Sequence, residues 1–237
     1  MSDGLSTTTP SAPGPTMPSP FRLIATLGLI AMLSGFTIVM VYQVTLGPIE
    51  RNHREALAEA VFEVLPGAVS RANFRLEDEA LQALDDEAFD RANVYAGYDE
   101  EGQLVGVALE GSGQGYGGTV RVLFGYAPDR ERIIGYTVLQ SSETPGLGDT
   151  IETEPHFLEN FDDLDASLNE EKSALQNPIT LVPQSEKENP WEIDGISGAT
   201  VSSRAVADAV GQSAERNIPV IYRQVDVLRE NREGGAE

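Results

Sequence analysis

The sequence predicts a membrane-spanning helix followed by one α+β domain, in which a twisted antiparallel sheet is flanked by helices. Three features of the sequence lead to this prediction. An almost uncharged apolar stretch lies near the N-terminus, strand-like segments joined by turns fill the middle, and a segment of helical periodicity lies near the C-terminus. The chain has 237 residues, a length that suits one domain and an anchor.

The N-terminal stretch divides into a tail and an apolar helix. Residues 1–20 are rich in Ser, Thr, Pro and Gly, a composition typical of a disordered tail. Residues 21–49 carry a single charge, on Arg22, and exceed the roughly 20 apolar residues that span a bilayer. A signal peptide is the competing interpretation, but its short apolar region, basic start and small-residue cleavage site are missing. A retained transmembrane helix is therefore expected.

The flanking charges do not decide on which side of the membrane the domain lies. Arg22 precedes the apolar helix, whereas Arg51 and Arg54 follow it. Because cytoplasmic flanks usually carry the excess of basic residues, this near balance slightly favours a cytoplasmic domain.

The charge and composition of the chain exclude several functions. The soluble domain is expected over residues 50–225, with a polar tail over residues 226–237. With 38 Asp and Glu against 16 Lys and Arg, the formal net charge is −22. This acidity argues against a nucleic-acid partner and against a domain that lies on an anionic membrane surface. There is no cysteine, so any electron transfer requires an organic cofactor, and neither a metal site nor a catalytic residue is expected.

The elements of the domain follow from periodicity and turn signals. A helix is expected over 54–65, where Pro66-Gly67 ends it. The expected strands form two hairpins, over 94–111 with a turn at 99–102 and over 119–144 with a turn at 127–132. Short helices are expected at 155–161 and 164–175, a strand at 178–183, and a helix at 201–217 whose core-facing residues are Val201, Ala205, Ala209 and Val210.

Three Gly-rich loops interrupt this layout, at 111–118, 141–149 and 194–200. None matches a phosphate-binding loop, a dinucleotide fingerprint or a nucleophile elbow. The last loop, "DGISGAT", directly precedes the C-terminal helix, and the first N–H groups of a helix favour an anion. Two interpretations of the loop stay open: Ser197, Thr200 or Ser202 caps the helix, or an anion such as phosphate is held at Thr200.

The loop motifs resemble those of a known family. "DGISGAT" matches Asp-x-x-Ser/Thr-Gly-Ala-Thr, the motif of FMN-binding domains that carry FMN on threonine through a phosphoester. "GYGGTVRVLFGY" and "SSETPGLGD" precede it in the family's order. Over roughly residues 20–220 the chain resembles the RnfG family, the flavoproteins of Rnf-type ion-translocating electron-transport complexes. A related family is found in the sodium-pumping NADH:quinone reductase, as its C subunits.

The resemblance implies a role for each motif residue. FMN would be attached to Thr200 by a separate FAD:protein FMN transferase that uses a divalent metal and recognises the motif. The residues recognised would be Asp194, Ser197, Gly198, Ala199 and Thr200. The isoalloxazine would be lined by Glu143, Thr144, Pro145, Gly146, Leu147 and Gly148, with Leu147 as an apolar wall, and the phosphate would lie near Ser197, Gly198 and Ala199.

The resemblance also implies a location and partners. The chain would be a single-pass protein of the cell inner membrane with its domain on the periplasmic side, in a complex with other Rnf-type subunits. Two alternatives stay open, an FMN-carrying domain of another extracytoplasmic respiratory system and a membrane-tethered module that binds its ligand without a covalent bond. Covalent flavin would exclude the second, and co-purification with the complex would exclude the first.

Overall fold

The computed structural model describes residues 19–230 of the chain. The chain divides into two compact units, residues 1–51 and 52–237. Helix α1 (Pro20–Val64) contributes its first part to the first unit and its last turns to the second. The tail expected over residues 1–20 lies almost entirely outside the described residues.

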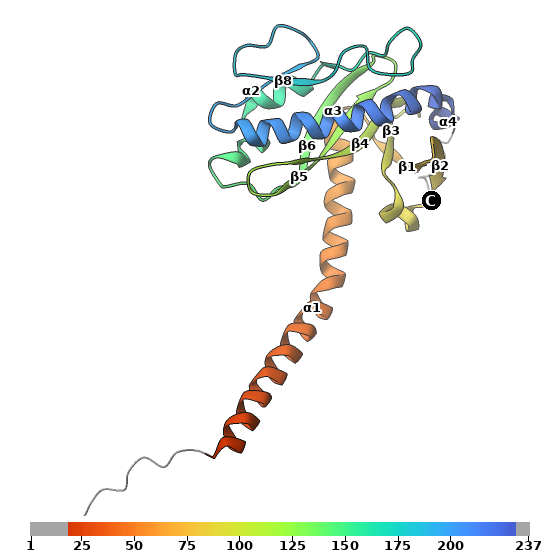
Figure 1. Ribbon diagram of the computed structural model, residues 1–237. Helices are drawn as coiled ribbons and strands as arrows, with labels where there is room; N and C mark the ends of the chain where they lie inside the picture. The colour runs from red at the N-terminus through yellow and green to blue at the C-terminus, as the bar shows by residue number, and fades with distance from the viewer. Residues whose placement is uncertain (1–18, 231–237) are drawn as a thin grey trace, which may run out of the picture. The chain divides into compact units, whose positions relative to one another are not determined.

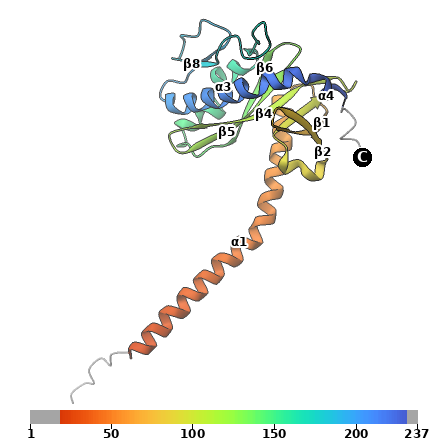
Figure 2. The same ribbon diagram turned by 45° about the vertical axis from the view of Figure 1, so that its right-hand side comes forward.

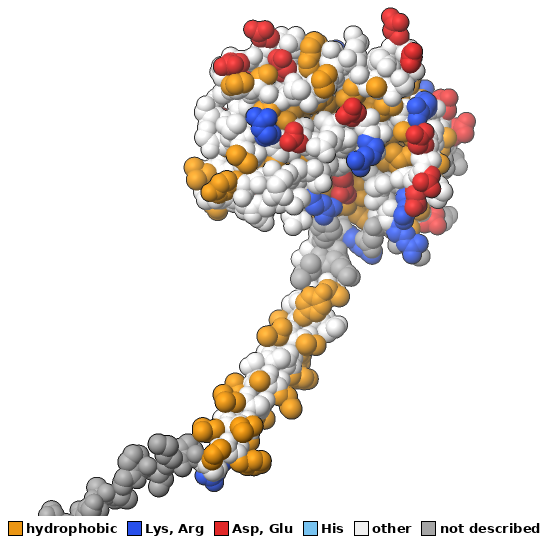
Figure 3. Space-filling model, viewed as in Figure 1, with side chains coloured by type: hydrophobic (Ala, Val, Ile, Leu, Met, Phe, Trp, Pro, Cys, Tyr) orange, Lys and Arg blue, Asp and Glu red, His pale blue; other side chains and the backbone are white. Residues whose placement is uncertain are grey.

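The first unit contains an apolar helix of sufficient length to cross a membrane. Over Pro20–Pro48 the mean hydropathy of α1 reaches 2.2, and its side chains are exposed rather than packed inside the protein. Hydrophobic side chains cover the face of this segment seen in Figure 3. These 29 residues form about 44 Å of helix at 1.5 Å per residue, more than the ~30 Å of a bilayer core. The predicted apolar helix is therefore confirmed.

The second unit is built on a seven-stranded sheet with the order β2-β1-β3-β4-β5-β6-β7, in which all neighbouring strands are antiparallel (Figure 1). Its strands are β1 (Ser70–Glu77), β2 (Ala80–Leu84), β3 (Val94–Tyr98), β4 (Leu104–Gln114), β5 (Thr119–Ala127), β6 (Arg132–Gln140) and β7 (Leu164–Asp165). Two more strands, β8 (Thr180–Val182) and β9 (Glu192–Asp194), pair in parallel outside this sheet.

Helices cover both faces of the sheet. Helix α3 (Thr200–Arg223) crosses one face over β4 and β5, as Figures 1 and 2 show from two directions. The last turns of α1 pack on the opposite face. Successive side chains of a strand point to opposite faces of the sheet, so a central strand packs against α3 on one face and against α1 on the other. On β4, Val107 and Leu109 are buried in the α3-side core, whereas Ala108 lies between them in the α1-side core.

Glycines allow both helices to lie unusually close to the sheet. A Cβ atom on Gly113 of β4 would lie 2.0 Å from the backbone oxygen of Ala205 in α3. On the other face, a Cβ on Gly125 of β5 would lie 1.9 Å from the backbone oxygen of Val64 in α1. Any larger residue would have to push the helix away from the sheet.

The remaining helices are short and lie between the strands or at the C-terminal end. They are η1 (Asp86–Arg91), η2 (Gly148–Glu152), α2 (Pro155–Leu158), η3 (Glu159–Phe161) and α4 (Val225–Glu230). In α4, Leu228 is fully buried and its backbone oxygen accepts a hydrogen bond of 2.6 Å from the Tyr98 hydroxyl. The packed part of the chain therefore extends beyond residue 225, the domain boundary expected from the sequence.

The two central hairpins, the strand near residue 180 and the α+β class agree with the sequence prediction. The helix expected over 164–175 is wrong. That segment contains β7 and a turn in which the Asn169 side-chain oxygen accepts the backbone N–H of Ser173 at 2.9 Å. Local bonds of this kind compete with helix formation.

Two further expectations are corrected by the structure. Residues 111–114 of the first Gly-rich loop belong to strand β4 rather than to a loop. Val201 does not face the core, because 51% of its surface is exposed. Strands β1, β2 and β9, the last of which pairs in parallel with β8, were not predicted from the sequence.

Gly113→Ala is expected to lower the free energy of unfolding by about 1–3 kcal/mol, since the new methyl group must displace α3. Ser112→Ala, an exposed neighbour on the same strand, is the control and should change it by less than about 0.5 kcal/mol. Urea unfolding of the detergent-solubilised chain, followed by the fluorescence of its single tryptophan, measures both. Equal stabilities of the two variants would show that the helix does not depend on this close contact.

Candidate functional site

The three Gly-rich loops meet at the N-terminal end of α3 and enclose a cavity of about 340 Å³. Pockets that hold small molecules and cofactors start at about 300 Å³, so the size suits one. The cavity is lined by Tyr116, Glu143, Thr144, Leu147, Gly148, Gly198, Ala199, Thr200, Val201 and Ser202. Each of the loops singled out in the sequence contributes to this lining.

Seven of the ten cofactor-binding residues expected from the sequence lie in this lining: Glu143, Thr144, Leu147, Gly148, Gly198, Ala199 and Thr200. Pro145, Gly146 and Ser197 are exposed and lie outside it. Two lining residues, Tyr116 and Val201, were not predicted, whereas Ser202 was considered from the sequence as a helix cap beside Thr200. Tyr116 lies inside the quoted "GYGG" motif, so an aromatic residue within a Gly-rich loop was the signal available for it.

A buried carboxylate forms part of the cavity wall. Glu143 is 8% exposed, and its two oxygens are held by a loop and by the first turn of α3. The backbone N–H of Gly117 donates to Oε1 at 2.9 Å, and the Ser202 hydroxyl donates to Oε2. Cβ atoms on Gly115 and Gly148 would each lie 2.3 Å from this carboxylate, so a larger residue at either position would displace it. Glu143 thus joins all three segments of the site.

The start of α3 has no side-chain cap. The residue before the helix is Ala199, and no side chain hydrogen-bonds to the helix start in the described part of the chain. The serines have other partners: Ser202 donates to Glu143, and the Ser203 oxygen accepts the backbone N–H of Ile196 at 3.2 Å. The interpretation of this loop as an ordinary side-chain cap is therefore wrong. The first N–H groups of the helix remain available to an anion beside the exposed Thr200.

The loop before Thr200 is held in a fixed shape by backbone contacts. Gly198 has φ +87°, a conformation that favours glycine. The N–H of Gly195 donates to the Val182 oxygen at 3.0 Å, and the N–H of Ser197 donates to the Gln184 side chain at 3.1 Å. The position of Thr200 is thus defined by strand β8 as well as by its own helix.

Asp194, the first residue of the motif, is buried in a polar cluster below the loop. It is 4% exposed, and its Oδ2 lies 2.7 Å from His156 Nε2. Its Oδ1 accepts the N–H of Ser185 at 2.6 Å, and its own N–H donates to Asn160 at 3.0 Å. Lys187 donates to the same Asn160 oxygen at 3.1 Å, and burial lowers the pKa of Lys187 below its usual value. The Asp194 side chain therefore supports the loop from inside.

Apolar side chains surround the mouth of the cavity. Tyr116 is 80% exposed, Leu147 is 59% exposed and Val201 is 51% exposed. They come from three different segments, and all three line the same cavity. Exposed apolar groups gathered at a pocket are typical of a binding site for a flat or apolar ligand.

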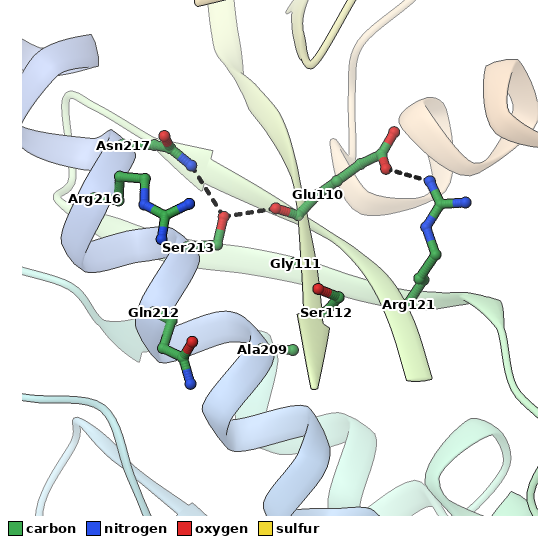
Figure 4. Close-up of a pocket in the computed structure, with 9 residues that line it drawn as sticks. All are labelled: Glu110, Gly111, Ser112, Arg121, Ala209, Gln212, Ser213, Arg216 and Asn217. Atoms are coloured by element: carbon green, nitrogen blue, oxygen red, sulfur yellow. Dashed lines mark hydrogen bonds and ion pairs between the residues drawn. The ribbon is translucent and has the colours of Figure 1, made fainter. Parts of the chain in front are cut away.

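A second cavity, of about 250 Å³, lies between β4 and α3 (Figure 4). Its lining is mostly polar and includes Arg121 and Arg216, which extend from opposite sides in the view. Arg121 is paired with Glu110 at 2.6 Å, and the Ser213 hydroxyl donates to the Glu110 backbone oxygen at the same distance. The cavity contains no residue of the loops at 141–149 and 194–200, so it is not the site indicated by the sequence.

Comparison with known proteins identifies the class of this domain. The family model for the FMN-binding domain matches residues 115–215, a range that includes every residue lining the cavity at Thr200. Crystal structures of NqrC, the C subunit of the Na⁺-translocating NADH-quinone reductase, share the fold. The Shewanella oneidensis protein aligns with a TM-score of 0.58 and 19% identity, covering 75% of this chain and 99% of that one. The Parabacteroides distasonis protein aligns with a TM-score of 0.55 and 19% identity, covering 75% of this chain and 94% of that one.

Curated relatives identify the particular family. The G subunit of the ion-translocating oxidoreductase complex of Methanosarcina acetivorans is 31% identical over 194 residues, which cover 82% of this chain and 92% of that protein. The G subunit of the Na⁺-translocating ferredoxin:NAD⁺ oxidoreductase complex of Acetobacterium woodii is 31% identical, covering 82% of this chain and 90% of that protein. The chain belongs to this family, the G subunits of ion-translocating oxidoreductase complexes.

Asp194→Ala is expected to lower the free energy of unfolding by about 1–3 kcal/mol, because the buried carboxylate would no longer accept its hydrogen bonds from Ser185 and His156. Asn160→Ala should have a similar effect, since it removes the other support of the same loop. Exposed Asp162→Ala is the control and should be almost neutral. Urea unfolding compares the three variants, and full stability of Asp194→Ala would show that its side chain has no structural role.

Proposed function

We propose that this chain is the FMN-carrying electron-transport subunit of an Rnf-type ion-translocating oxidoreductase complex, with FMN bound covalently to Thr200 through a phosphoester. One observation supports Thr200 as the attachment site. Helix α3 begins at an exposed threonine, without a side-chain cap, at the edge of a cavity with an apolar rim. A hydroxyl acceptor, anion-binding N–H groups and a surface for the ring are thus adjacent.

The attachment would exchange the phosphoanhydride bond of FAD for a phosphoester bond to threonine. The Thr200 hydroxyl oxygen bonds to the phosphorus of the FMN half of FAD, the bond from that phosphorus to AMP breaks, and AMP leaves. The hydroxyl proton passes to solvent, and no electrons are transferred. A separate FAD:protein FMN transferase with a divalent metal would perform this step, so Thr200 is an acceptor and not a catalytic nucleophile.

The surroundings of the cavity suit a flavin. Tyr116, Leu147 and Val201 would lose exposed apolar surface against the ring, which is favourable at about 25 cal/mol per Å². The flavin supplies the redox chemistry, and the protein supplies position and solvent access. The chain has no cysteine, so its own side chains provide neither an iron–sulfur cluster nor a disulfide as an electron carrier.

The proposed location is supported by family and helix together. The apolar part of α1 has the length and composition to anchor the chain as a single-pass membrane protein, and relatives are subunits of ion-translocating complexes. We place the protein in the inner membrane with its domain on the periplasmic side, among other Rnf-type subunits. A covalent bond suits that side, because FMN lost outside the cytoplasm would not be replaced.

Thr200→Val is expected to abolish covalent FMN while the domain still folds, because the residue is exposed. The chain is expressed with an active FMN transferase and examined by fluorescence on a denaturing gel and by intact mass. The unmutated chain should be heavier by one FMN less one water. Thr144→Val is the matched control, since Thr144 lines the same cavity and must keep the flavin.

A fluorescent Thr200→Val band would assign the attachment to another residue. A dark band of the unmutated chain, with the transferase active on a known acceptor, would favour the non-covalent binding module. A fluorescent chain that purifies without other subunits from its native membrane would favour another respiratory system over an Rnf-type complex.

A pair of variants distinguishes two possible roles of Asp194, which are recognition by the transferase and support of the loop. Asp194→Ala should lower the flavinylated fraction, and so should Asn160→Ala, which weakens the same support without changing the motif. The flavinylated fraction is read from intact mass after a short reaction. If Asn160→Ala is flavinylated as well as the unmutated chain, Asp194 acts through direct recognition rather than through the position of the loop.

A further inference from the structure

We infer that Arg204 binds the phosphate of the attached FMN and directs the phosphate and the ring to opposite sides of Thr200. This inference rests on the proposed attachment of FMN at Thr200. It assigns to the site a positioning residue outside the "DGISGAT" motif.

Thr200 lies between two cavities. One is the cavity of about 340 Å³ described above, and the other, of about 270 Å³, lies between strand β8 and the start of α3. Thr200 is the residue that lines both, and Arg204 lines the second. A group attached to the threonine oxygen therefore has space on either side.

The geometry of the helix brings the Arg204 side chain toward Thr200. The two residues are four apart in α3, so they are neighbours on one helix face, with Cβ atoms about 5–6 Å apart. The Cα–Cβ bonds of a helix point toward its N-terminus, and long side chains extend back over the preceding turn. The guanidinium consequently reaches the same end of the helix as the open N–H groups.

Arg204 has no carboxylate partner among the residues whose side chains the structure describes. Most arginines of the folded unit do have one, as Arg121 has Glu110 and Arg132 has Asp165. Asp208, one turn further along α3, makes no ion pair with Arg204. In a chain with a net charge of −22, an unpaired arginine beside the acceptor threonine is suited to an anionic ligand.

The charges that line the two cavities indicate which cavity would hold the phosphate and which would hold the isoalloxazine ring. The cavity with the apolar rim contains one carboxylate, Glu143, and no cation in its lining. The cavity on the other side contains Arg204 and no carboxylate in its lining. A phosphodiester carries one negative charge, so it is repelled by the first and attracted by the second. The ring is left to the side of Tyr116 and Leu147.

Chemical modification of the unmutated full chain tests the contact without any variant. Phenylglyoxal reacts with free guanidinium groups, and peptide mass spectrometry measures the reaction at each arginine. Covalent FMN should slow the modification of Arg204 about two- to fivefold, the range of an exposed ion pair. Arg216, exposed and unpaired on the same helix, is the internal control and should react equally with and without FMN.

Phosphorus NMR then distinguishes two reasons for slower modification of Arg204: contact of its guanidinium with the phosphate, or shielding of the side chain by the isoalloxazine ring. In phosphorus-free detergent, Arg204→Gln should shift the single phosphodiester resonance, whereas Arg216→Gln should not. Added salt should move the resonance of the unmutated chain toward that of Arg204→Gln, because salt screens exposed ion pairs.

The outcomes separate this inference from the proposed function. A chain that carries no FMN on Thr200 overturns the proposed attachment, and with it the inference. A flavinylated chain in which Arg204 and Arg216 react alike, or in which Arg204→Gln leaves the resonance unchanged, overturns the inference alone. Selective protection of Arg204 together with the shifted resonance supports both.

Discussion

The close contact between helix α3 and strand β4 is the constraint on which the rest of the domain depends. Gly111 and Gly113 admit backbone oxygens of the helix into space that a side chain would fill. A helix is rigid along its axis, so fixing its middle on the sheet also fixes where it begins. Thr200 is brought in this way to the loops at 115–118 and 143–148, which enter the cavity from the other strands.

Two buried carboxylates hold the site from different sides. Glu143 joins the loops around the cavity, and Asp194 joins the motif loop to the segments around His156 and Ser185. Buried charges are tolerated only with such partners. The two motif residues therefore differ in placement, since Thr200 is exposed whereas Asp194 is buried and supports the loop that carries it.

The sequence predicted what depends on local pattern. The hairpins follow from strand residues around turns, and the three motifs marked the loops that meet at Thr200. It did not predict contacts between distant residues, such as Ser202 with Glu143, 59 residues apart. Strand β1 was missed because its "SRANFRLE" mixes polar and charged residues with few apolar ones. The false helix at 164–175 shows that side-chain bonds in a turn can override helical spacing.

Helix α3 starts without a side-chain cap, and under the proposed attachment a newly made chain would differ from the finished protein at this point. An uncapped helix start is less stable than a capped one by about 1 kcal/mol. A phosphate on Thr200 would occupy the same N–H groups and remove that weakness. Proteases cut where a backbone opens locally, so chains that never receive their cofactor would be degraded first. Maturation would then determine the lifetime of the protein as well as its activity.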